Sequence, residues 1–388
     1  MTMKRLLYKT LPLALAVTLQ FTGCDNKRAT SVNTPVISQT VSAFYRPESC
    51  TFSLDGKFLF VTNCAAGFYG VDSKGNKQFS LAQGKGAVSK LSVAEDGTLT
   101  MIEPKFFPNT SGALGITVLP VATGKFPAGS LFFNSGFFMQ TDADDKYIDN
   151  QKELDPAIVI IDPDSGKLLG KISLAMDGEL CKSINNPVFI PNGLCFDHEG
   201  NLYIGETGGT NELIKDAGKI TNKSGVIKIP HNAIEPLCSG KAAIGLKFLE
   251  APAINEVAFD KETDTIMMLT FSGSEAGNSL YKVTRSEFDQ GILPEPFVTV
   301  KGQLDGVVIT PGRNILVTDV ANQRLLKIDQ SGQVKTVAFG DKKFNGPSDI
   351  KIKYLEDGSS IVILPEQELD ASKTWTQNVH VIKLPVGY

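Results

Sequence analysis

The sequence predicts an all-β protein of the β-propeller class, built from four-stranded antiparallel blades. Runs rich in Val, Ile, Phe and Leu alternate with Asp-Gly, Asn-Gly and Ser-Gly turns, and no stretch shows a long helical period with caps. A short strand pair also recurs with a polar residue at the same first position. The copies begin at residues 48, 89, about 129, 192, 255, 305 and 349. A β-sandwich is the alternative, but it leaves this in-phase repeat unexplained, whereas a repeat architecture such as a propeller accounts for it.

Each recurring pair is followed by further β-rich runs that complete a four-stranded meander. The sixth unit, for example, continues with runs at 324–328 and 334–337, separated by an Asp-Gln-Ser-Gly turn. The shortest spacings between units approach the roughly 40–45 residues that a four-stranded blade needs. The third unit, at 131–140, is degenerate. We therefore expect seven blades, or six if the third unit is an insertion.

The ends of the chain are expected to close the ring. The last unit supplies only three clear strands, at 350–353, 361–364 and 379–384, so one strand of its blade is missing. A propeller protects its sheet edges by closing the ring. The segment 36–45 can provide the missing outer strand, which predicts a propeller over residues 38–388 that couples the two termini.

The N-terminus has the pattern of a secretory signal. Lys4 and Arg5 precede a short apolar run at 11–19, which leads to Phe21-Thr-Gly-Cys24. Cys after Thr-Gly resembles the bacterial lipobox, which implies a signal peptide at 1–23, an acylated Cys24 and a flexible tether at 24–37. Acyl chains anchor a protein because each buried CH₂ contributes about 0.8 kcal/mol. An ordinary secreted protein cut nearby is the alternative.

The expected location is therefore extracytoplasmic, with the chain anchored to a bacterial membrane through lipid only. Asp25 follows Cys24 and resembles the inner-membrane retention signal of enterobacterial lipoproteins, which favours the periplasmic face of the inner membrane. The net charge of -4 and the absence of a Lys/Arg block exclude the usual footprint of a nucleic-acid binder. We expect a monomer.

Five cysteines remain besides Cys24, and an extracytoplasmic location permits disulfides. Cys50 and Cys64 fall on the two arms of one predicted hairpin, so they are the first candidate pair. Cys181 and Cys195 are the next. Because five is odd, at least one thiol is left over. Buried, unpaired cysteines are the alternative, and no zinc-type spacing occurs.

The polar first residues of the repeats indicate where chemistry would lie. The innermost strand of each blade lines the central channel, so its first residue lies at one mouth. Carboxylates and amides gathered there suit a hard cation such as Ca²⁺ or Mg²⁺, and carboxylates packed closely without a cation would repel one another. The alternative is that these side chains only cap turns. The in-phase residues are Glu48, Ser89, Asn192, Asn255, Asp305 and Asp349.

Two stretches, 191–204 and 314–324, resemble the repeats of NHL-type and SMP-30/gluconolactonase/regucalcin-like propellers. Those enzymes bind a divalent metal through a Glu in Glu-Ser, an Asn in Asn-Gly and an Asp in Asp-Gly. The resemblance implies that Glu48, Asn192 and Asp305 are metal ligands and that Asp305 is the candidate base. Paraoxonase-like propellers add another Asn, which Asn255 matches, and Asp349 is a further candidate ligand.

The sequence also departs from that family. The relatives have six blades, against the seven expected here, and the Asn-Asp motif of their third blade has no match. The three histidines, His198, His231 and His380, lie away from the polar ring and do not suggest a histidine mechanism.

Two functions are compatible with these expectations. The first is hydrolysis of a lactone or ester, in which Ca²⁺ or Mg²⁺ polarises the carbonyl and Asp305 activates water. The second is a non-catalytic propeller scaffold that binds a protein or another envelope ligand with its loop face. The fold class hosts both roles.

Overall fold

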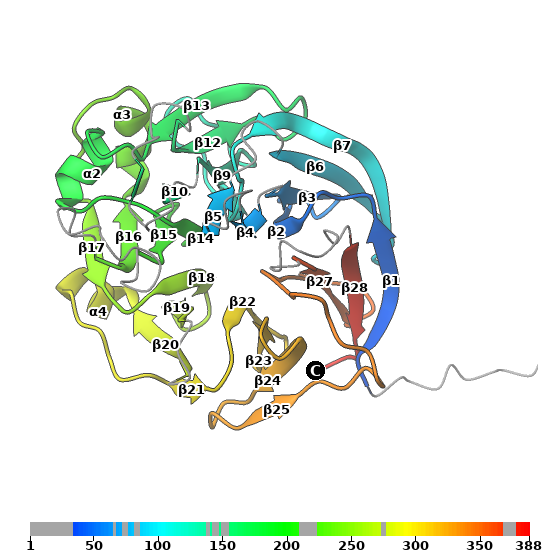
Figure 1. The fold of residues 1–388 in the computed structure, drawn as a ribbon. Coiled ribbons are helices and arrows are strands. Elements are labelled where there is room, and N and C mark those ends of the chain that lie inside the picture. Colours follow the sequence, from blue (N-terminus) through cyan, green and yellow to red (C-terminus); the bar gives the residue numbers. More distant parts are fainter. Residues whose placement is uncertain are drawn as a thin grey trace, which may run out of the picture. The chain divides into compact units, whose positions relative to one another are not determined.

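Six four-stranded antiparallel sheets stand around one central axis like the blades of a propeller (Figure 1). The computed structural model describes residues 34–64, 67–71, 77–80, 86–136, 140–141, 147–148, 155–208, 223–272, 277–367 and 378–388. The expected signal peptide and the expected acylation site at Cys24 lie outside these residues. Within them, no helix is long and apolar enough to cross a membrane.

The first three blades use residues 47–250, and their strands follow from the innermost outward. Blade 1 is β2 (Pro47–Phe52), β3 (Phe58–Asn63), β6 (Gly86–Val93) and β7 (Leu99–Thr110). Blade 2 is β8 (Ile116–Val118), β9 (Leu131–Ser135), β12 (Ala157–Ile161) and β13 (Leu168–Ser173). Blade 3 is β14 (Pro191–Phe196), β15 (Leu202–Glu206), β16 (Gly225–Ile229) and β17 (Lys247–Glu250).

The other three blades complete the ring. Blade 4 is β18 (Ile254–Asp260), β19 (Thr265–Thr270), β20 (Asn278–Thr284) and β21 (Val298–Val300). Blade 5 is β22 (Leu304–Ile309), β23 (Ile315–Asp319), β24 (Arg324–Ile328) and β25 (Val334–Thr336). Blade 6 is β26 (Lys351–Tyr354), β27 (Ser360–Pro365), β28 (Asn378–Leu384) and β1 (Val36–Ser42).

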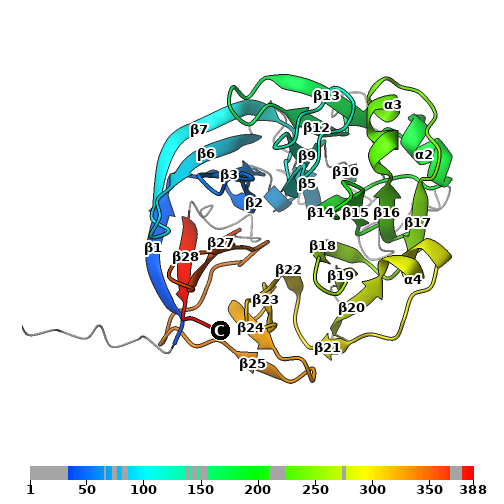
Figure 2. The ribbon, with the colours of Figure 1, turned by 180° about the vertical axis from the view of Figure 1, so that it is seen from behind.

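Short helices and hairpins decorate this frame. The helices α2 (Glu179–Ile184), α3 (Ile234–Cys238) and α4 (Arg285–Gln290) lie at the outer rim in both views (Figures 1 and 2), and a 3-10 turn (His231–Ala233) precedes α3. Two hairpins, β4 (Gly67–Val71) with β5 (Lys77–Ser80) and β10 (Gln140–Thr141) with β11 (Tyr147–Ile148), interrupt blades 1 and 2. Both follow the second strand of their blade, so they lie on the face where the inner strands begin.

The expected count of seven blades is wrong, and the structure has the alternative count of six. Ser89 does not begin a blade, because it lies on β6 opposite Val61, in the third strand of blade 1. Its hydroxyl donates to Pro104 O at 2.7 Å and accepts from Asn63 Nδ2 at 2.9 Å, so this buried polar side chain is satisfied inside the blade. The degenerate unit at 131–140 begins with β9, the second strand of blade 2. Its inner strand β8 begins with Ile116 and lacks the polar signal.

The closure of the ring by the N-terminal strand is confirmed. β1 pairs antiparallel with β28, from Val36 opposite Lys383 to Ser42 opposite Asn378, and becomes the outer strand of blade 6. The core lies between neighbouring blades, whose facing side chains are almost entirely apolar. One such layer joins blades 6 and 1 through Phe44, Leu59, Leu91, Ile363 and Val381.

The expected disulfide between Cys50 and Cys64 does not form. Cys50 lies opposite Val61 in the β2–β3 pair, whereas Cys64 lies beyond the end of β3, where its N–H donates to Arg46 O at 3.0 Å. The hairpin register thus keeps the two sulfurs apart. Both side chains are buried, as the alternative interpretation of the cysteines expects, and Cys181 and Cys195 likewise form no disulfide.

Candidate functional site at the channel

Four inner strands carry a register irregularity where their first polar residue lies. The pairing shifts between Pro47 and Cys50, Pro191 and Leu194, Ile254 and Glu256, and Leu304 and Val307. These four intervals contain Glu48, Asn192, Asn255 and Asp305. A β-bulge redirects a side chain and is common next to functional sites. The irregularity therefore distinguishes these residues from the regular strand that follows. We call this set the carboxylate–amide cluster.

Three members of the cluster are joined by side-chain hydrogen bonds. Asn192 Nδ2 donates to Asn255 Oδ1 at 2.6 Å, and Asn255 Nδ2 donates to Asp305 Oδ1 at 2.8 Å. Blade 2 supports this chain through Asn134, whose Nδ2 donates to the backbone oxygen of Asn192 at 2.6 Å. Asn134 lies on β9, inside the unit that looked degenerate, so the sequence pattern did not identify it.

The glycines of the Asn-Gly and Asp-Gly motifs allow the inner strands to approach closely. A Cβ at Gly193 would lie 2.6 Å from Glu256 Cα, and one at Gly306 would lie 2.5 Å from Ile350 N. Both distances are far below a normal contact, so any larger residue would push neighbouring blades apart at this mouth. The glycine in each motif thus has a packing role.

A second group of charged side chains lies beside the cluster, and we call it the Lys351 network. Lys351 Nζ contacts both oxygens of Asp349, at 2.9 and 2.7 Å, and lies 3.6 Å from Glu256 Oε1. Asp349 also accepts from Ile350 N at 2.7 Å and from Ser49 Oγ. Asp349, an expected metal ligand, is therefore held by a lysine. Glu256 and Lys351 were not anticipated, although each lies one or two residues after a polar first residue, Asn255 or Asp349.

Glu48 has a buried oxygen without a hydrogen-bond partner, as does Glu256, whose Oε1 however lies 3.6 Å from Lys351 Nζ. The Glu48 side chain is 2% exposed, and Oε2 makes no hydrogen bond within the described chain. An ionised carboxylate is normally paired when it is buried, because an unpaired charge loses its hydration without compensation. This atom is therefore the one in the cluster most in need of a proton or a cation.

Burial and mutual repulsion raise the pKa values of Glu48 and Asp305. Burial, followed by the charges of Asp305, Asp349 and Glu256, raises the pKa of Glu48 well above its ordinary value. Burial and the charge of Asp349 raise the pKa of Asp305 to about 7, although the hydrogen bond from Asn255 opposes the shift.

The pKa values of Glu256 and Lys351, in the Lys351 network, are also shifted by burial and by neighbouring charges. Burial and then Asp349 raise the pKa of Glu256. Burial alone would lower the pKa of Lys351, but Asp349 and Glu256 outweigh it and raise that pKa. Lys351 thus remains charged and offsets part of the negative charge of Asp349 and Glu256.

The cluster suits a hard cation by its donor chemistry. Its side chains offer carboxylate and amide oxygens, the ligands that Ca²⁺ and Mg²⁺ prefer. Among the described residues, no group of three or more His, Cys, Asp and Glu side chains is arranged to hold a metal, so any site here depends on the two asparagines. The residues that could hold a cation are Glu48, Asn192, Asn255 and Asp305. Ser89 lies outside this set.

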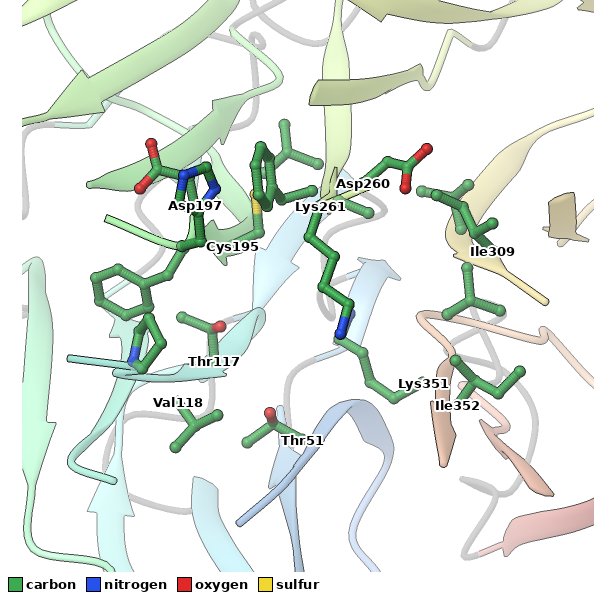
Figure 3. Close-up of a pocket in the computed structure, with 18 of the residues that line it drawn as sticks. Thr51, Thr117, Val118, Cys195, Asp197, Asp260, Lys261, Ile309, Lys351 and Ile352 are labelled. Atoms are coloured by element: carbon green, nitrogen blue, oxygen red, sulfur yellow. The ribbon is translucent and has the colours of Figure 1, made fainter. Parts of the chain in front are cut away.

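A pocket of about 540 Å³ lies at the other end of the inner strands. Residues from the later half of those strands line it, including Thr51, Cys195, Val257, Val307 and Ile352 (Figure 3). We call it the distal pocket. Lys351 belongs to both regions, because its stem lines the pocket while its ammonium contacts Asp349. No motif in the sequence indicated this cavity.

The fold and the channel place the chain among six-bladed propellers with a polar cluster at one mouth. No protein-family model matches the sequence, and no curated protein matches it significantly. Solved structures do share the fold. The PQQ-bound aldose sugar dehydrogenase from Streptomyces coelicolor has a TM-score of 0.53 and 14% identity, over 90% of this chain and 98% of its own.

Two further solved structures are similar to a comparable degree. A luciferin-regenerating enzyme has a TM-score of 0.50 and 14% identity, over 88% of this chain and 92% of its own. A protein assigned provisionally to the gluconolactonases has a TM-score of 0.50 and 11% identity, over 91% of this chain and 93% of its own. The resemblance to gluconolactonase- and SMP-30-like propellers is thus confirmed at the level of fold, and the correction to six blades removes one departure from them.

Proposed function

We propose that this protein is a metal-dependent hydrolase that opens a lactone or cleaves an ester at the carboxylate–amide cluster. The observation that carries the proposal is the coincidence of the four bulged inner strands with Glu48, Asn192, Asn255 and Asp305. Turn capping alone would not require the same irregularity in four blades. The fold neighbours include gluconolactonase-like propellers, which supports this choice of reaction.

In this proposal, Glu48, Asn192, Asn255 and Asp305 hold a divalent cation. Once bound, Ca²⁺ or Mg²⁺ would polarise the substrate carbonyl and stabilise its developing negative charge. Asn255, whose amide donates to Asp305 Oδ1, orients that carboxylate. Asp305 takes a proton from water as the water oxygen bonds to the carbonyl carbon. The acyl C–O bond then breaks, and the proton passes to the leaving oxygen, which gives a hydroxy acid from a lactone.

The Lys351 network completes the site by dividing the acids into two groups. Lys351 supplies a permanent positive charge to Asp349 and Glu256. Among the described residues, no lysine or arginine is in ion-pair contact with Glu48 or Asp305, and in this proposal they are the carboxylates that bind the metal. Asp349 then acts as a support for the site in place of a direct ligand.

The decisive experiment measures metal content and hydrolysis together. Purified protein would be tested on aliphatic and sugar lactones and on p-nitrophenyl acetate, with Ca²⁺, with Mg²⁺ and with EDTA. Asp305→Asn should abolish hydrolysis while the protein stays folded. Asp329→Asn is the matched control, because Asp329 only caps an exposed turn through Ser331 and Gln333. Folded wild-type protein that binds neither metal and hydrolyses nothing would support the non-catalytic scaffold.

We also propose that the chain is held on the extracytoplasmic side of a bacterial membrane by acylation of Cys24. The proposal depends on the Phe21-Thr-Gly-Cys24 pattern and on the polar stretch that follows it. Cys24→Ser should move the protein from the membrane fraction to the soluble fraction and remove palmitate labelling. Unchanged fractionation of Cys24→Ser would contradict the anchor.

A further inference from the structure

The distal pocket has the size and the walls of a small-molecule site. Its volume of about 540 Å³ lies within the range of roughly 300–1,000 Å³ that is usual for ligand pockets. Apolar side chains from five inner strands form most of its wall: Val118, Leu194, Val257, Val307, Ile309 and Ile352. Such walls favour the apolar body of a ligand.

The polar groups without a partner in this pocket can all donate hydrogen bonds. Thr51 and Thr117 lie on neighbouring inner strands and are 6% and 9% exposed, and neither hydroxyl has a hydrogen-bond partner in the described chain. Lys261 follows the end of β18 and likewise has no ion pair with any described residue. In Figure 3, Lys261 extends from the rim toward the middle of the pocket, and both threonine side chains lie along its wall.

The acids of the pocket, by contrast, are already satisfied. Asp260 accepts from Arg313 Nη1 at 2.9 Å and from Thr263 Oγ1 at 2.5 Å, and Glu262 lies 3.1 Å from the same guanidinium. Asp197 accepts from Asn201 N at 2.9 Å and from Arg285. Lys351 is equally committed, since its ammonium contacts Asp349. A ligand that pairs with the Lys261 ammonium must supply an acceptor, and both hydroxyls can donate to the same group, which points to an anion.

The carboxylates deeper in the channel favour an anion that carries a single negative charge. Glu256 and Asp349 lie just beyond Lys351, with Asp305 and Glu48 behind them, so a multivalent anion would be repelled. A single carboxylate placed between Lys261 and the two hydroxyls avoids most of this repulsion. It also has the geometry to accept several hydrogen bonds at once.

We propose that the distal pocket is a second binding site, separate from the carboxylate–amide cluster, for a small monocarboxylate with an apolar body. Lys261 binds the carboxylate at the rim, Thr51 and Thr117 donate to it, and the aliphatic part packs against Val257, Val307 and Ile352. This site does not depend on the hydrolase activity, because the pocket lies at the opposite mouth of the channel.

The test uses octanoate as the probe and the full protein. Isothermal titration should detect octanoate binding to the wild-type protein and much weaker binding of 1-octanol, which has the same chain without the charge. Lys261→Gln should weaken octanoate binding by about tenfold or more, because the charged hydrogen bond to the carboxylate is lost. The double change Thr51→Val with Thr117→Val keeps the side-chain shape and should weaken it by a similar factor.

Two control variants distinguish binding in the distal pocket from binding elsewhere on the protein. Lys241→Gln removes an exposed lysine outside the pocket and should leave octanoate binding unchanged. Asp329→Asn changes an exposed turn far from the pocket and should also leave octanoate binding unchanged. Because binding is measured without any hydrolysis, failure of the hydrolase proposal would not affect the result. The inference is overturned if octanoate does not bind at millimolar concentration, if octanol binds equally well, or if Lys261→Gln behaves like Lys241→Gln.

Discussion

Replacing Lys351 with methionine tests the electrostatic organisation of the channel. The substitution keeps most of the stem in place and removes the one positive charge that contacts Asp349 at 2.7 Å and Glu256 at 3.6 Å. Breaking a buried ion pair by removing one partner leaves an uncompensated charge and costs about 3–5 kcal/mol. We expect Lys351→Met to lose about that much free energy of unfolding at pH 7.5.

Lys353→Met is the matched control on the same strand. Within the described chain Lys353 makes one hydrogen bond, to Gly56 O at 2.8 Å, so its loss should cost about 1.5–3 kcal/mol, less than the loss at Lys351. Urea unfolding followed by circular dichroism gives both values from midpoints at a common slope. The difference in unfolding free energy between the two variants should narrow at pH 5, because Glu256, whose pKa is raised by burial and by Asp349, can then take up a proton. Equal losses for the two variants at pH 7.5 would refute the role assigned to Lys351.

Three further predictions concern the ring and its acids. Because the folded pKa of Asp305, about 7, exceeds its ordinary value of 3.8, the folded state binds this proton more tightly than the unfolded state. Stability in EDTA should therefore be highest in mild acid and fall as pH rises to about 7, by on the order of a few kcal/mol, and melting temperatures across that range would show it. A deletion that ends at Ser42 removes β1, the strand that pairs with β28. It should lower the free energy of unfolding by on the order of 5 kcal/mol, at about 1 kcal/mol for each hydrogen bond lost. An unchanged urea midpoint would contradict ring closure. Thr284→Ala removes the capping box of α4 with Glu287 and should cost about 1 kcal/mol, whereas Ser286→Ala should cost less.

Much of the fold could be predicted because the pattern of buried strands is local. The missing strand of the last unit identified the closure by β1, since a blade needs four strands. The blade count failed for an equally physical reason. Ser89 repeats the polar-then-apolar pattern although it lies in a third strand, because all strands of a blade are packed between neighbours. Conversely, β8 is only three residues long and begins with Ile116, so it carries no signal.

The candidate site was predictable only where residues recur in phase. Glu48, Asn192, Asn255 and Asp305 share a position in their units, and hydrogen bonds join three of them. Their bulges could not be predicted, because register depends on the partner strand.

The rest of the channel required the structure. Glu256 and Lys351 come from blades 4 and 6 and meet only in the folded ring, so their ion pair leaves no motif. The distal pocket is formed by single residues from many strands, which explains why no sequence motif indicated it.

The most direct test of the central claim is a crystal structure of the protein grown with Mn²⁺, whose anomalous signal locates the ion in place of Ca²⁺ or Mg²⁺. Our account predicts one strong peak at the Glu48 mouth of the channel, with oxygens of Glu48, Asn192, Asn255 and Asp305 at about 2.0–2.6 Å. Asp305→Asn crystals should lack the peak or show it strongly reduced. Well-ordered wild-type crystals with no peak at this mouth, and Glu48 protonated or bonded to water alone, would contradict the account.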